Sequence, residues 1–240
     1  MGLSHATNEQ NQRSKLIRDT KSRHPKWRMT KTRNKMIKNI VFDFGGVLVQ
    51  YDYIAYFTEY FHSEEKARHF FEQVLPKSFN NEVDRALHPF SYYIERQKRQ
   101  WPEYAEAIDH FDHHFADFFT GETVGMYEWM CQLKSEGYRL LGLSNWSTKV
   151  HDVIARFPRV FEPLEDCLIS YSCHLLKPER DIYELFCKKF SVRPEECVFI
   201  DDRPANIEGA REAGMHGIVF KDMDQLKRDM NDLLHGLPEQ

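Results

Sequence analysis

The sequence has no apolar run that approaches the roughly 20 residues needed to cross a bilayer, so we expect no transmembrane segment and no membrane partner. Its first thirty or so residues also lack the apolar stretch of a secretory signal, and we therefore expect a cytoplasmic location. The hydrophobic content of 41% and the charged content of 29% are typical of a soluble globular protein.

Cysteine is scarce, and its five positions do not follow the pattern of a disulfide framework. The number is odd, no Cys-x-x-Cys spacing occurs, and most of the five fall inside apolar runs. We therefore favour buried free thiols in a reducing compartment over disulfide bonds.

Acidic residues are nearly absent from the first part of the chain. Residues 1–38 hold 11 Lys or Arg and 2 Asp or Glu, whereas residues 39–240 hold 22 and 35. A basic segment with so few apolar residues cannot form a core, so we predict a disordered basic tail over residues 1–35. The alternative is an arm for nucleic acid or a membrane surface. We favour a solvated tail and predict no nucleic-acid partner.

Short apolar runs predict five buried strands, at 37–44, 138–144, 165–172, 196–202 and 216–220. Their length and β-branched content suit strands that are covered on both faces. Helical patterns lie between the later runs, at about 125–136, 148–157, 179–190 and 204–213. This alternation predicts a Rossmann-like α/β core with a parallel sheet and right-handed crossovers.

The segment from 53 to 120 interrupts this alternation. It is rich in aromatic and charged residues, contains no convincing strand, and suggests helices at 53–61, 63–74, 90–98 and 103–118. We therefore predict an inserted α-helical cap over residues 53–120. The Rossmann-like core is expected to comprise residues 36–52 and 121–240.

Polar side chains follow four of the predicted strands, at the edge of the sheet where ligands bind in open α/β folds. The first strand ends at Asp43, with Gly45 and Gly46 behind it. The next three deliver Ser144 and Asn145, then Lys177, then Asp201 and Asp202. Each feature is common alone, but the four together, in this order and on separate strands, would rarely arise by chance.

These residue types suit phosphate chemistry. Carboxylates from different strands form an oxygen-ligand site for Mg²⁺, and Ser, Lys and backbone N–H groups form a cradle for a phosphate. A cation and a phosphate cradle around one carboxylate indicate phosphoryl transfer through a covalent aspartyl phosphate.

The sequence resembles the haloacid dehalogenase superfamily of hydrolases, whose four motifs are matched in order by "VFDFGGVLV", "LLGLSNWS", "LLKPERDIY" and "VFIDDRPANIEGAREAG". The likeness covers residues 37–220, and the helical insertion is similar to the type 1 cap, which the family places between its first two motifs. The resemblance implies that Asp43 is the nucleophile and that Ser144 and Lys177 bind the phosphoryl group.

The resemblance also implies a Mg²⁺ site formed by Asp43, the carbonyl of Gly45 and Asp202, with Asp201 beside it. Asn145 would help to bind the phosphate through its backbone N–H, and Lys177 would offset the charge of the nucleophile. Trp146 is expected to line the mouth of the pocket and stack on a sugar or another ring, or else to be a plain packing residue; the two interpretations are equally supported.

One position departs from the family pattern. Phosphatases of this superfamily usually carry a second Asp two residues after the nucleophile, as general acid and then base, but Gly45 stands there. Such help is worth roughly 10²–10⁴-fold. A branch that resembles bacterial glucose-1-phosphate phosphatases has the same Asp-x-Gly arrangement and an Asp nine residues after the nucleophile, matched here by Asp52. We favour Asp52 as a hinge residue over a direct catalytic role.

A missing acid should matter most when the departing oxygen is strongly basic, so a sugar 1-phosphate is the specific substrate that we expect. We predict a Mg²⁺-dependent phosphatase that acts on a small phosphorylated metabolite. The alternatives are a non-catalytic phosphometabolite-binding protein and, less favoured because Asp201 and Asp202 form a metal pair, a dehalogenase. His110 and His114 form either a metal site or, as we favour, a polar face of a cap helix. The sequence predicts no oligomeric state.

Overall fold

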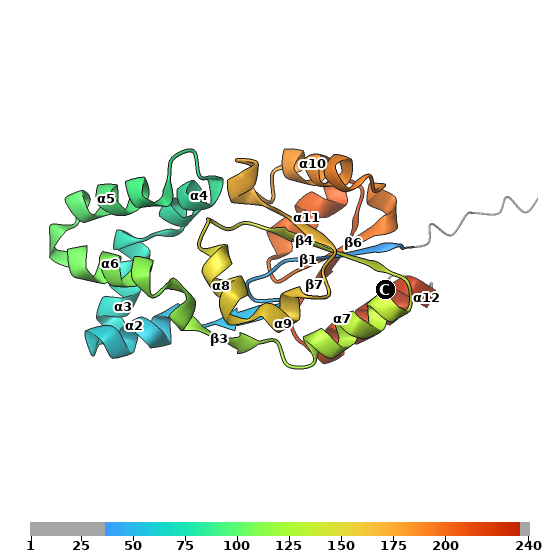
Figure 1. Cartoon of the computed structure of the whole chain (residues 1–240), viewed down its shortest axis with the longest axis horizontal. Coiled ribbons are helices and arrows are strands. Elements are labelled where there is room, and N and C mark those ends of the chain that lie inside the picture. Colours follow the sequence, from blue (N-terminus) through green and yellow to red (C-terminus); the bar gives the residue numbers. More distant parts are fainter. Residues whose placement is uncertain (1–36, 236–240) are drawn as a thin grey trace, which may run out of the picture. The chain divides into compact units, whose positions relative to one another are not determined.

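Five parallel strands form a sheet in the part of the chain that the structure, a computed structural model, describes: residues 37–235 (Figure 1). They are β1 (Asn39–Phe42), β4 (Arg139–Ser144), β5 (Asp166–Ile169), β6 (Cys197–Asp201) and β7 (His216–Val219), in the order β5-β4-β1-β6-β7. Every neighbouring pair is parallel, which confirms the predicted Rossmann-like core. The predicted basic tail lies outside the described residues.

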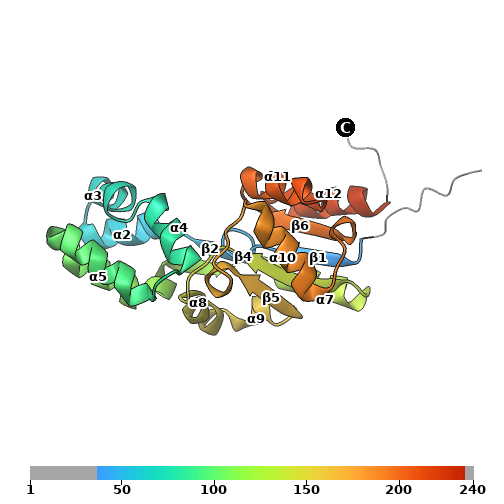
Figure 2. The same cartoon turned by 90° about the horizontal axis from the view of Figure 1, so that it is seen from above.

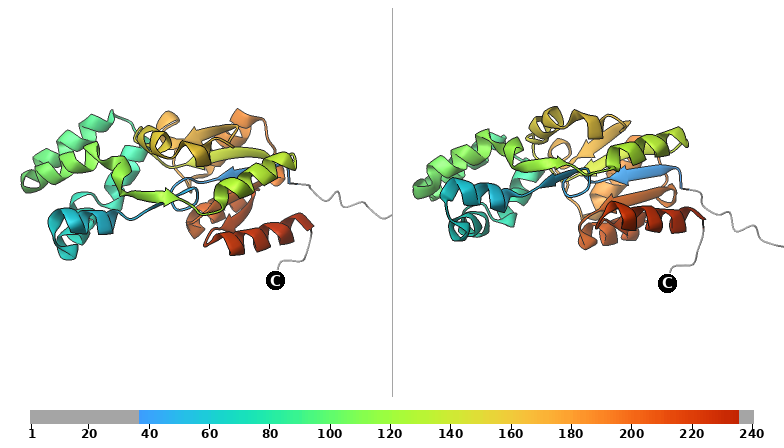
Figure 3. Two further views of the ribbon diagram at one scale, coloured as in Figure 1. Left: turned by 60° about the horizontal axis from the view of Figure 1, so that its bottom comes forward. Right: turned by 90° about the horizontal axis from the view of Figure 1, so that it is seen from below.

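The central strand β1 contributes side chains to both faces of the sheet because successive strand residues point in opposite directions. Val41 belongs to a buried cluster with apolar residues of α10 (Arg180–Phe190) and α11 (Pro204–Glu212). Ile40 and Phe42 belong to a second cluster, which includes residues of α7 (Met126–Ser135) and α12 (Met223–His235). Figure 3 shows α7 in yellow-green and α12 in red over this second face.

Helices α7, α10 and α11 lie close to the positions that the helical patterns predict, whereas α12 was not predicted. The predicted segment at 148–157 contains α8 (Val150–Arg156), after which the short helix α9 (Pro158–Phe161) follows. Three short 3₁₀-helices belong to the core or to its junction with the cap: η3 (Phe115–Phe118), η4 (Ser170–Ser172) and η5 (Pro194–Glu196). No helix within residues 37–235 is long and apolar enough to cross a membrane.

A group of helices inserted after the first strand forms the predicted cap (Figure 1). It contains α2 (Tyr53–Phe61), α3 (Glu64–His69) with the π-helical turn η1 (Phe70–Val74), α4 (Lys77–Arg85), α5 (Phe90–Gln100), η2 (Pro102–Tyr104) and α6 (Ala105–His113). The sequence patterns predicted all of these regions as helical except α4 and the turn η2. Helix α4 was missed because its sequence, KSFNNEVDR, is polar and contains two Asn, which are weak helix formers.

Two short antiparallel strands connect the core to the cap (Figure 2). They are β2 (Val49–Tyr51) and β3 (Phe119–Glu122). The expectation that residues 53–120 contain no strand is therefore wrong at the last two of these residues, where β3 begins. The signal was weak because each strand is only three or four residues long and β3 contains Gly121.

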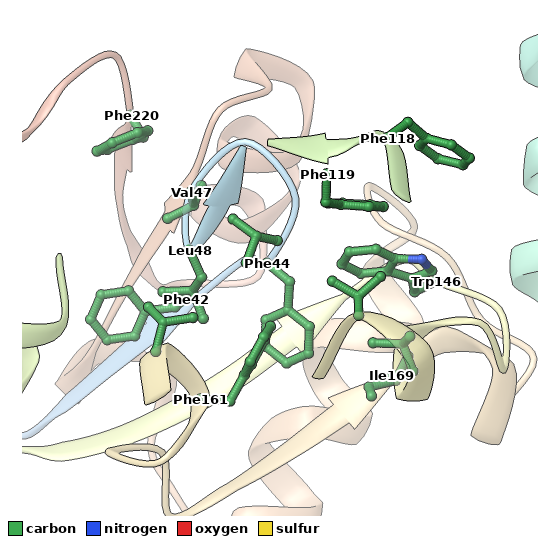
Figure 4. Close-up of a cluster of buried hydrophobic side chains, with 14 of the residues drawn as sticks. Phe42, Phe44, Val47, Leu48, Phe118, Phe119, Trp146, Phe161, Ile169 and Phe220 are labelled. Atoms are coloured by element: carbon green, nitrogen blue, oxygen red, sulfur yellow. The ribbon is translucent and has the colours of Figure 1, made fainter. Parts of the chain in front are cut away.

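Glycine in the middle of β4 allows the loop that follows Asp43 to pack against the sheet. A Cβ atom at Gly142 would lie 2.6 Å from Cε1 of Phe44 and 2.8 Å from Cβ of Cys167. The Phe44 ring also meets the ring of Phe161 edge-on at 5.0 Å between centroids. Figure 4 shows Phe44 between Phe161 and Trp146, with Phe119 above Trp146. This packing holds the turn that follows Asp43.

Candidate active site

A cavity of about 330 Å³ lies where the carboxyl ends of the central strands meet the cap. Most of the residues that the sequence singled out line it together: Asp43, Gly45, Ser144, Asn145, Trp146, Lys177 and Asp202. Asp201 lies behind them and is fully buried. The order of strands around β1 explains this convergence, because β4 and β6 are its two direct neighbours.

The loop after β1 holds the backbone of Asp43 close to the next strand. The Asp43 amide donates to the carbonyl of Ile200 at 2.9 Å, and the carbonyl of Phe44 accepts the amides of the following tight turn. Gly46 has a φ of +78°, and a Cβ atom there would lie 2.8 Å from Oδ2 of Asp202. Only glycine combines this backbone conformation with so close an approach of a carboxylate.

Lys177 is the centre of the charged network. Its side chain is almost fully buried, and its ammonium group donates to Asp201 Oδ2 at 2.7 Å and to the carbonyl of Leu143 at 3.0 Å. It also lies 2.9 Å from Asp43 Oδ1. Although burial opposes the charged form, the two carboxylates raise the pKa of Lys177, so it is a cation at neutral pH.

Asp43 is held in a fixed orientation but is strongly desolvated. Its Oδ1 accepts the backbone N–H of Phe44 at 2.7 Å in addition to the ammonium group of Lys177. Burial raises the pKa of Asp43 to about 7, against the lowering effect of Lys177 and the Ser144 hydroxyl, and Asp201 adds to the rise. A second positive charge beside Asp43 would therefore favour its ionised form.

The two aspartates at the end of β6 have different roles. Asp201 accepts hydrogen bonds from Lys177, from the Arg203 amide at 2.8 Å and from the Asn206 side chain at 2.9 and 3.0 Å. Burial opposes its charge, but these donors hold the pKa of Asp201 below its usual value. Asp202 is partly exposed and lines the cavity, and burial followed by the charge of Asp201 raises its pKa.

The carboxylates meet the requirement for a divalent cation. Asp43, Asp201 and Asp202 each offer an oxygen, and these oxygens all lie within 4.8 Å of one another. No hydrogen bond among residues 37–235 ends on the carbonyl of Gly45, which adjoins the cavity. Hard oxygen donors of this kind suit Mg²⁺. The pKa values of Asp43 and Asp202 are raised, so a bound cation would stabilise the ionised form of both carboxylates.

Asn145 has a side-chain role that the sequence did not indicate. Its Oδ1 accepts the backbone N–H of Lys177 at 2.8 Å, and its Nδ2 donates to the carbonyl of the same residue at 2.9 Å. This pair of hydrogen bonds fixes the backbone from which the Lys177 side chain reaches Asp43. The sequence had predicted only a contribution from the backbone N–H of Asn145.

Trp146 lines the cavity and also packs against neighbouring side chains. Its stacking on a substrate ring stays a prediction. Its ring stacks on Phe119 at 5.4 Å between centroids and contacts Phe44 at 6.3 Å. It is 7% exposed. The ring therefore forms a wall of the cavity that is already supported by neighbouring aromatic side chains.

Asp52 and the two histidines lie outside the catalytic centre. Asp52 is exposed and caps α2, because its Oδ1 accepts the Ala55 amide at 2.8 Å. His110 Nε2 is 3.0 Å from the hydroxyl of Tyr56, and His114 pairs with Asp117. Within the described residues, the two histidines and Asp117 do not form a group of three whose ligand atoms all lie within 4.8 Å of one another. Asp52 thus lies at the start of a cap helix, and the two histidines lie on a polar face of the cap.

Three charged residues of the cavity were missed by the sequence reasoning. Lys77 and Asp84 line the cavity from α4, and Arg203 lines it from the turn after β6. Burial raises the pKa of Asp84 to about 7, although Arg203 opposes this shift. The only sequence signal for Arg203 was its place directly after the Asp201–Asp202 pair. Asp84 had no signal, because its helix was not predicted.

Comparison with known proteins places this site in a family. A family model described as haloacid dehalogenase-like hydrolase matches residues 37–214. Flavin mononucleotide hydrolase 1 of Arabidopsis thaliana is 29% identical over 112 residues, which cover 45% of this chain and 44% of that protein. The chain thus matches less than half the length of this relative.

A second relative is similar over most of its length. D-ribitol-5-phosphate phosphatase of Bacteroides thetaiotaomicron is 25% identical over 197 residues, which cover 75% of this chain and 89% of that protein. A solved structure of a haloacid dehalogenase family enzyme from the same organism, in complex with magnesium and inorganic phosphate, has the same fold with a TM-score of 0.61. That comparison has 22% identity and covers 78% of this chain and 95% of the other. With its four motifs gathered at one sheet edge, the chain belongs to the haloacid dehalogenase-like hydrolases.

Proposed function

We propose that the protein is a Mg²⁺-dependent phosphatase that hydrolyses a small phosphorylated metabolite through a phosphoaspartyl intermediate on Asp43. The observation that carries this proposal is the contact of Lys177 with Asp43 at 2.9 Å, beside two further carboxylates and at the end of a cavity. A protein that only bound a phosphate would have no use for a carboxylate there, since like charges repel.

The side chains have separate tasks in this mechanism. Asp43 attacks phosphorus, while the Ser144 hydroxyl, the Asn145 amide and Lys177 bind the phosphoryl oxygens. The side chain of Asn145 keeps Lys177 in place. A bound Mg²⁺, held by Asp43, Asp202 and the carbonyl of Gly45 with Asp201 behind them, would offset the charge of the phosphate.

The names of the relatives support this reaction type. One is named for D-ribitol 5-phosphate and another for flavin mononucleotide, and both compounds are phosphate monoesters. The Asp-x-Gly arrangement at Asp43 and Gly45 supports a place in the branch that resembles bacterial glucose-1-phosphate phosphatases, with a type 1 cap. We assign the cap to residues 53–120 and the core to residues 36–52 and 121–240.

The lining of the cavity bears on the substrate. Aromatic rings form much of its wall, among them Tyr51, Phe71, Phe111, Phe119 and Trp146. Such rings pack against a flat apolar surface, either the C–H face of a sugar ring or an aryl group. A sugar 1-phosphate is the specific substrate that we propose, and aryl phosphates are the simplest compounds of the second kind.

The test is hydrolysis of a panel of phosphorylated metabolites together with p-nitrophenyl phosphate. We expect turnover that requires Mg²⁺, stops with EDTA and is abolished by Asp43→Asn, because an amide is a poor nucleophile and a weaker ligand. Titration of the variant with Mg²⁺ and phosphate, with its melting temperature, checks that it is folded. Wild-type turnover in Asp43→Asn would exclude the mechanism. Binding of phosphate without turnover in the wild type would favour the non-catalytic alternative.

A further inference from the structure

Asp84 is a carboxylate of the cap that shares the cavity with the nucleophile. It lies in the last turn of α4 and lines the same space as Asp43, Lys177 and Asp202. The mechanism above gives it no task. Burial raises the pKa of Asp84 and Asp43 adds to the rise, although Arg203 lowers it more strongly than Asp43 raises it.

Backbone and side-chain contacts fix Asp84 to the loop that follows β4. The carbonyl of Asp84 accepts the Ser170 hydroxyl at 2.8 Å, and the oxygen of the same hydroxyl accepts the backbone N–H of Trp146 at 2.8 Å. Against the effect of burial, the backbone N–H of Ser147 lowers the pKa of Asp84. The backbone of Asp84 is therefore connected, through Ser170, to the segment that follows the phosphate-binding Ser144.

The charges around Asp84 leave it able to exchange a proton near neutral pH. Burial raises the pKa of Asp84 to about 7; Arg203 and the Ser147 amide oppose the shift, Asp43 adds to it and Lys177 opposes it. A group with such a pKa is present in both protonation states at neutral pH, as a general acid and base needs to be.

The charged residues of α4 itself do not neutralise Asp84. Arg85 pairs with Glu179 of the core, and Glu82 pairs with Arg96 of α5. Lys77, at the start of the helix, lines the cavity but is not among the groups that shift the pKa of Asp84 most.

The position where an acid is expected from the family pattern is closed by another side chain. A Cβ atom at Gly45 would lie 3.3 Å from Cε1 of Tyr51 and 4.0 Å from Cζ3 of Trp146. Tyr51 is itself a poor acid near neutral pH, because burial and then the charge of Asp202 raise its pKa. Asp52, the other candidate for the general acid, is exposed and caps a helix.

We propose that Asp84 is the general acid and base of this hydrolase, supplied by the cap in place of the acid that Gly45 lacks. The assignment rests on the phosphatase activity proposed above. It explains how a chain without the second aspartate retains a complete nucleophile and phosphate cradle. It also makes the catalytic centre depend on the position of the cap.

The two half-reactions then balance. In the first, a bond forms between Asp43 and phosphorus as the bond from phosphorus to the ester oxygen breaks, and Asp84 gives its proton to that oxygen. In the second, water attacks phosphorus, the bond to Asp43 breaks, and the Asp84 carboxylate takes a proton from the water. Inorganic phosphate leaves, and both side chains return to their starting states.

The experiment compares two substrates with the same aromatic group: p-nitrophenyl phosphate, which releases an acidic phenol, and p-nitrobenzyl phosphate, which releases a basic alkoxide. In Asp84→Asn we expect kcat/KM to fall by about 10²-fold or more for the benzyl ester and by less than about tenfold for the phenyl ester. The phenyl ester should also give a burst of nitrophenolate, because the variant lacks the base for the second step. Asp84→Glu should restore part of the activity toward the benzyl ester.

Three further measurements make the result decisive. Asp52→Asn, the control, should retain the wild-type ratio between the substrates. An equal loss on both esters in Asp84→Asn, or a selective loss in Tyr51→Phe instead, would overturn the assignment. If the variant does not fold, the wild type alone decides: its kcat/KM for the benzyl ester should fall at high pH more steeply than that for the phenyl ester. A wild type active on neither ester nor any metabolite would instead refute the proposed phosphatase, and the assignment of Asp84 with it.

Discussion

At the scale of single residues, Gly46 allows the loop that follows Asp43 to approach Asp202 closely. We predict that Gly46→Ala weakens Mg²⁺ binding and lowers kcat/KM, because the methyl group would lie 2.8 Å from Asp202 Oδ2 and the backbone has a φ of +78°. A non-glycine residue in this conformation costs roughly 1–2 kcal/mol. The measurement is the Mg²⁺ dependence of hydrolysis, with the free energy of unfolding from urea denaturation.

Gly45→Ala is the matched control for this effect. Gly45 has no such backbone strain, and its Cβ atom would lie 3.3 Å from the Tyr51 ring and 4.0 Å from the Trp146 ring. We expect a smaller loss of Mg²⁺ affinity than in Gly46→Ala. Equal Mg²⁺ affinities in the two variants would show that Asp202 does not depend on the space beside Gly46.

The sequence predicted the residues that follow strands, because strand order alone brings them together. Asp43, Ser144 and Asp202 needed only a parallel sheet with β1 between β4 and β6. Asp84 could not be predicted in this way. Its place in the cavity depends on how a polar helix docks onto the core, and neither periodicity nor a motif encodes that contact in a single sequence.

At the scale of elements, helix α4 is one of the parts of the cap that contact the core directly. Arg85 donates to the carbonyl of His174 at 3.0 Å and pairs with Glu179, and the His174 ring lies 2.8 Å from the carbonyl of Arg85. These contacts lie beside Lys177, two residues before Glu179 in the chain. The same contacts therefore position both Asp84 and the segment that carries Lys177.

We predict that Arg85→Ala lowers kcat/KM for phosphate esters roughly tenfold or more, since a small misplacement of catalytic groups has effects of that size. The melting temperature should change little, because a partly exposed ion pair contributes about 1 kcal/mol or less. Steady-state kinetics and thermal unfolding measure the two effects.

Arg96→Ala provides the comparison for Arg85→Ala. Arg96 pairs with Glu82 inside the cap, so its loss removes a similar ion pair without touching the contact between cap and core. We expect unchanged kinetics. Equal kinetic losses in both variants would show that α4 is not positioned by its contact with the core.

Elements were predictable where their pattern was strong. The five core strands are continuous apolar runs, and α10 repeats buried residues at Ile182, Tyr183, Phe186 and Phe190, so both were visible in the sequence. The connecting strands β2 and β3 were not visible in the sequence, because strands of only three and four residues carry little periodic signal. Tertiary pairing, rather than local preference, forms them.

At the scale of the whole molecule, one buried apolar cluster extends from the sheet into the cap. It includes Phe42 of β1, Phe119 of β3 and Phe111 of α6. The cap is thus part of the same hydrophobic core as one face of the sheet, and substitutions in either should affect both. The cluster lies entirely within residues 37–235, as do the candidate catalytic residues.

Because the buried cluster and the candidate catalytic residues all lie within residues 37–235, we can predict the effect of removing residues 1–35. The segment is strongly basic, in contrast to the acidic remainder of the chain, and has few apolar side chains, so it has little surface with which to stabilise a fold. We expect the shortened protein to keep its melting temperature and its kcat/KM, and binding of nucleic acid to remain weak and salt-sensitive with or without the segment. Thermal unfolding, phosphatase assays and a salt titration measure these outcomes.

A fall of several degrees in melting temperature, or a loss of most of the activity, would assign the segment to the fold or the site. Tight binding of nucleic acid that disappears on truncation would show that the segment is a nucleic-acid-binding arm.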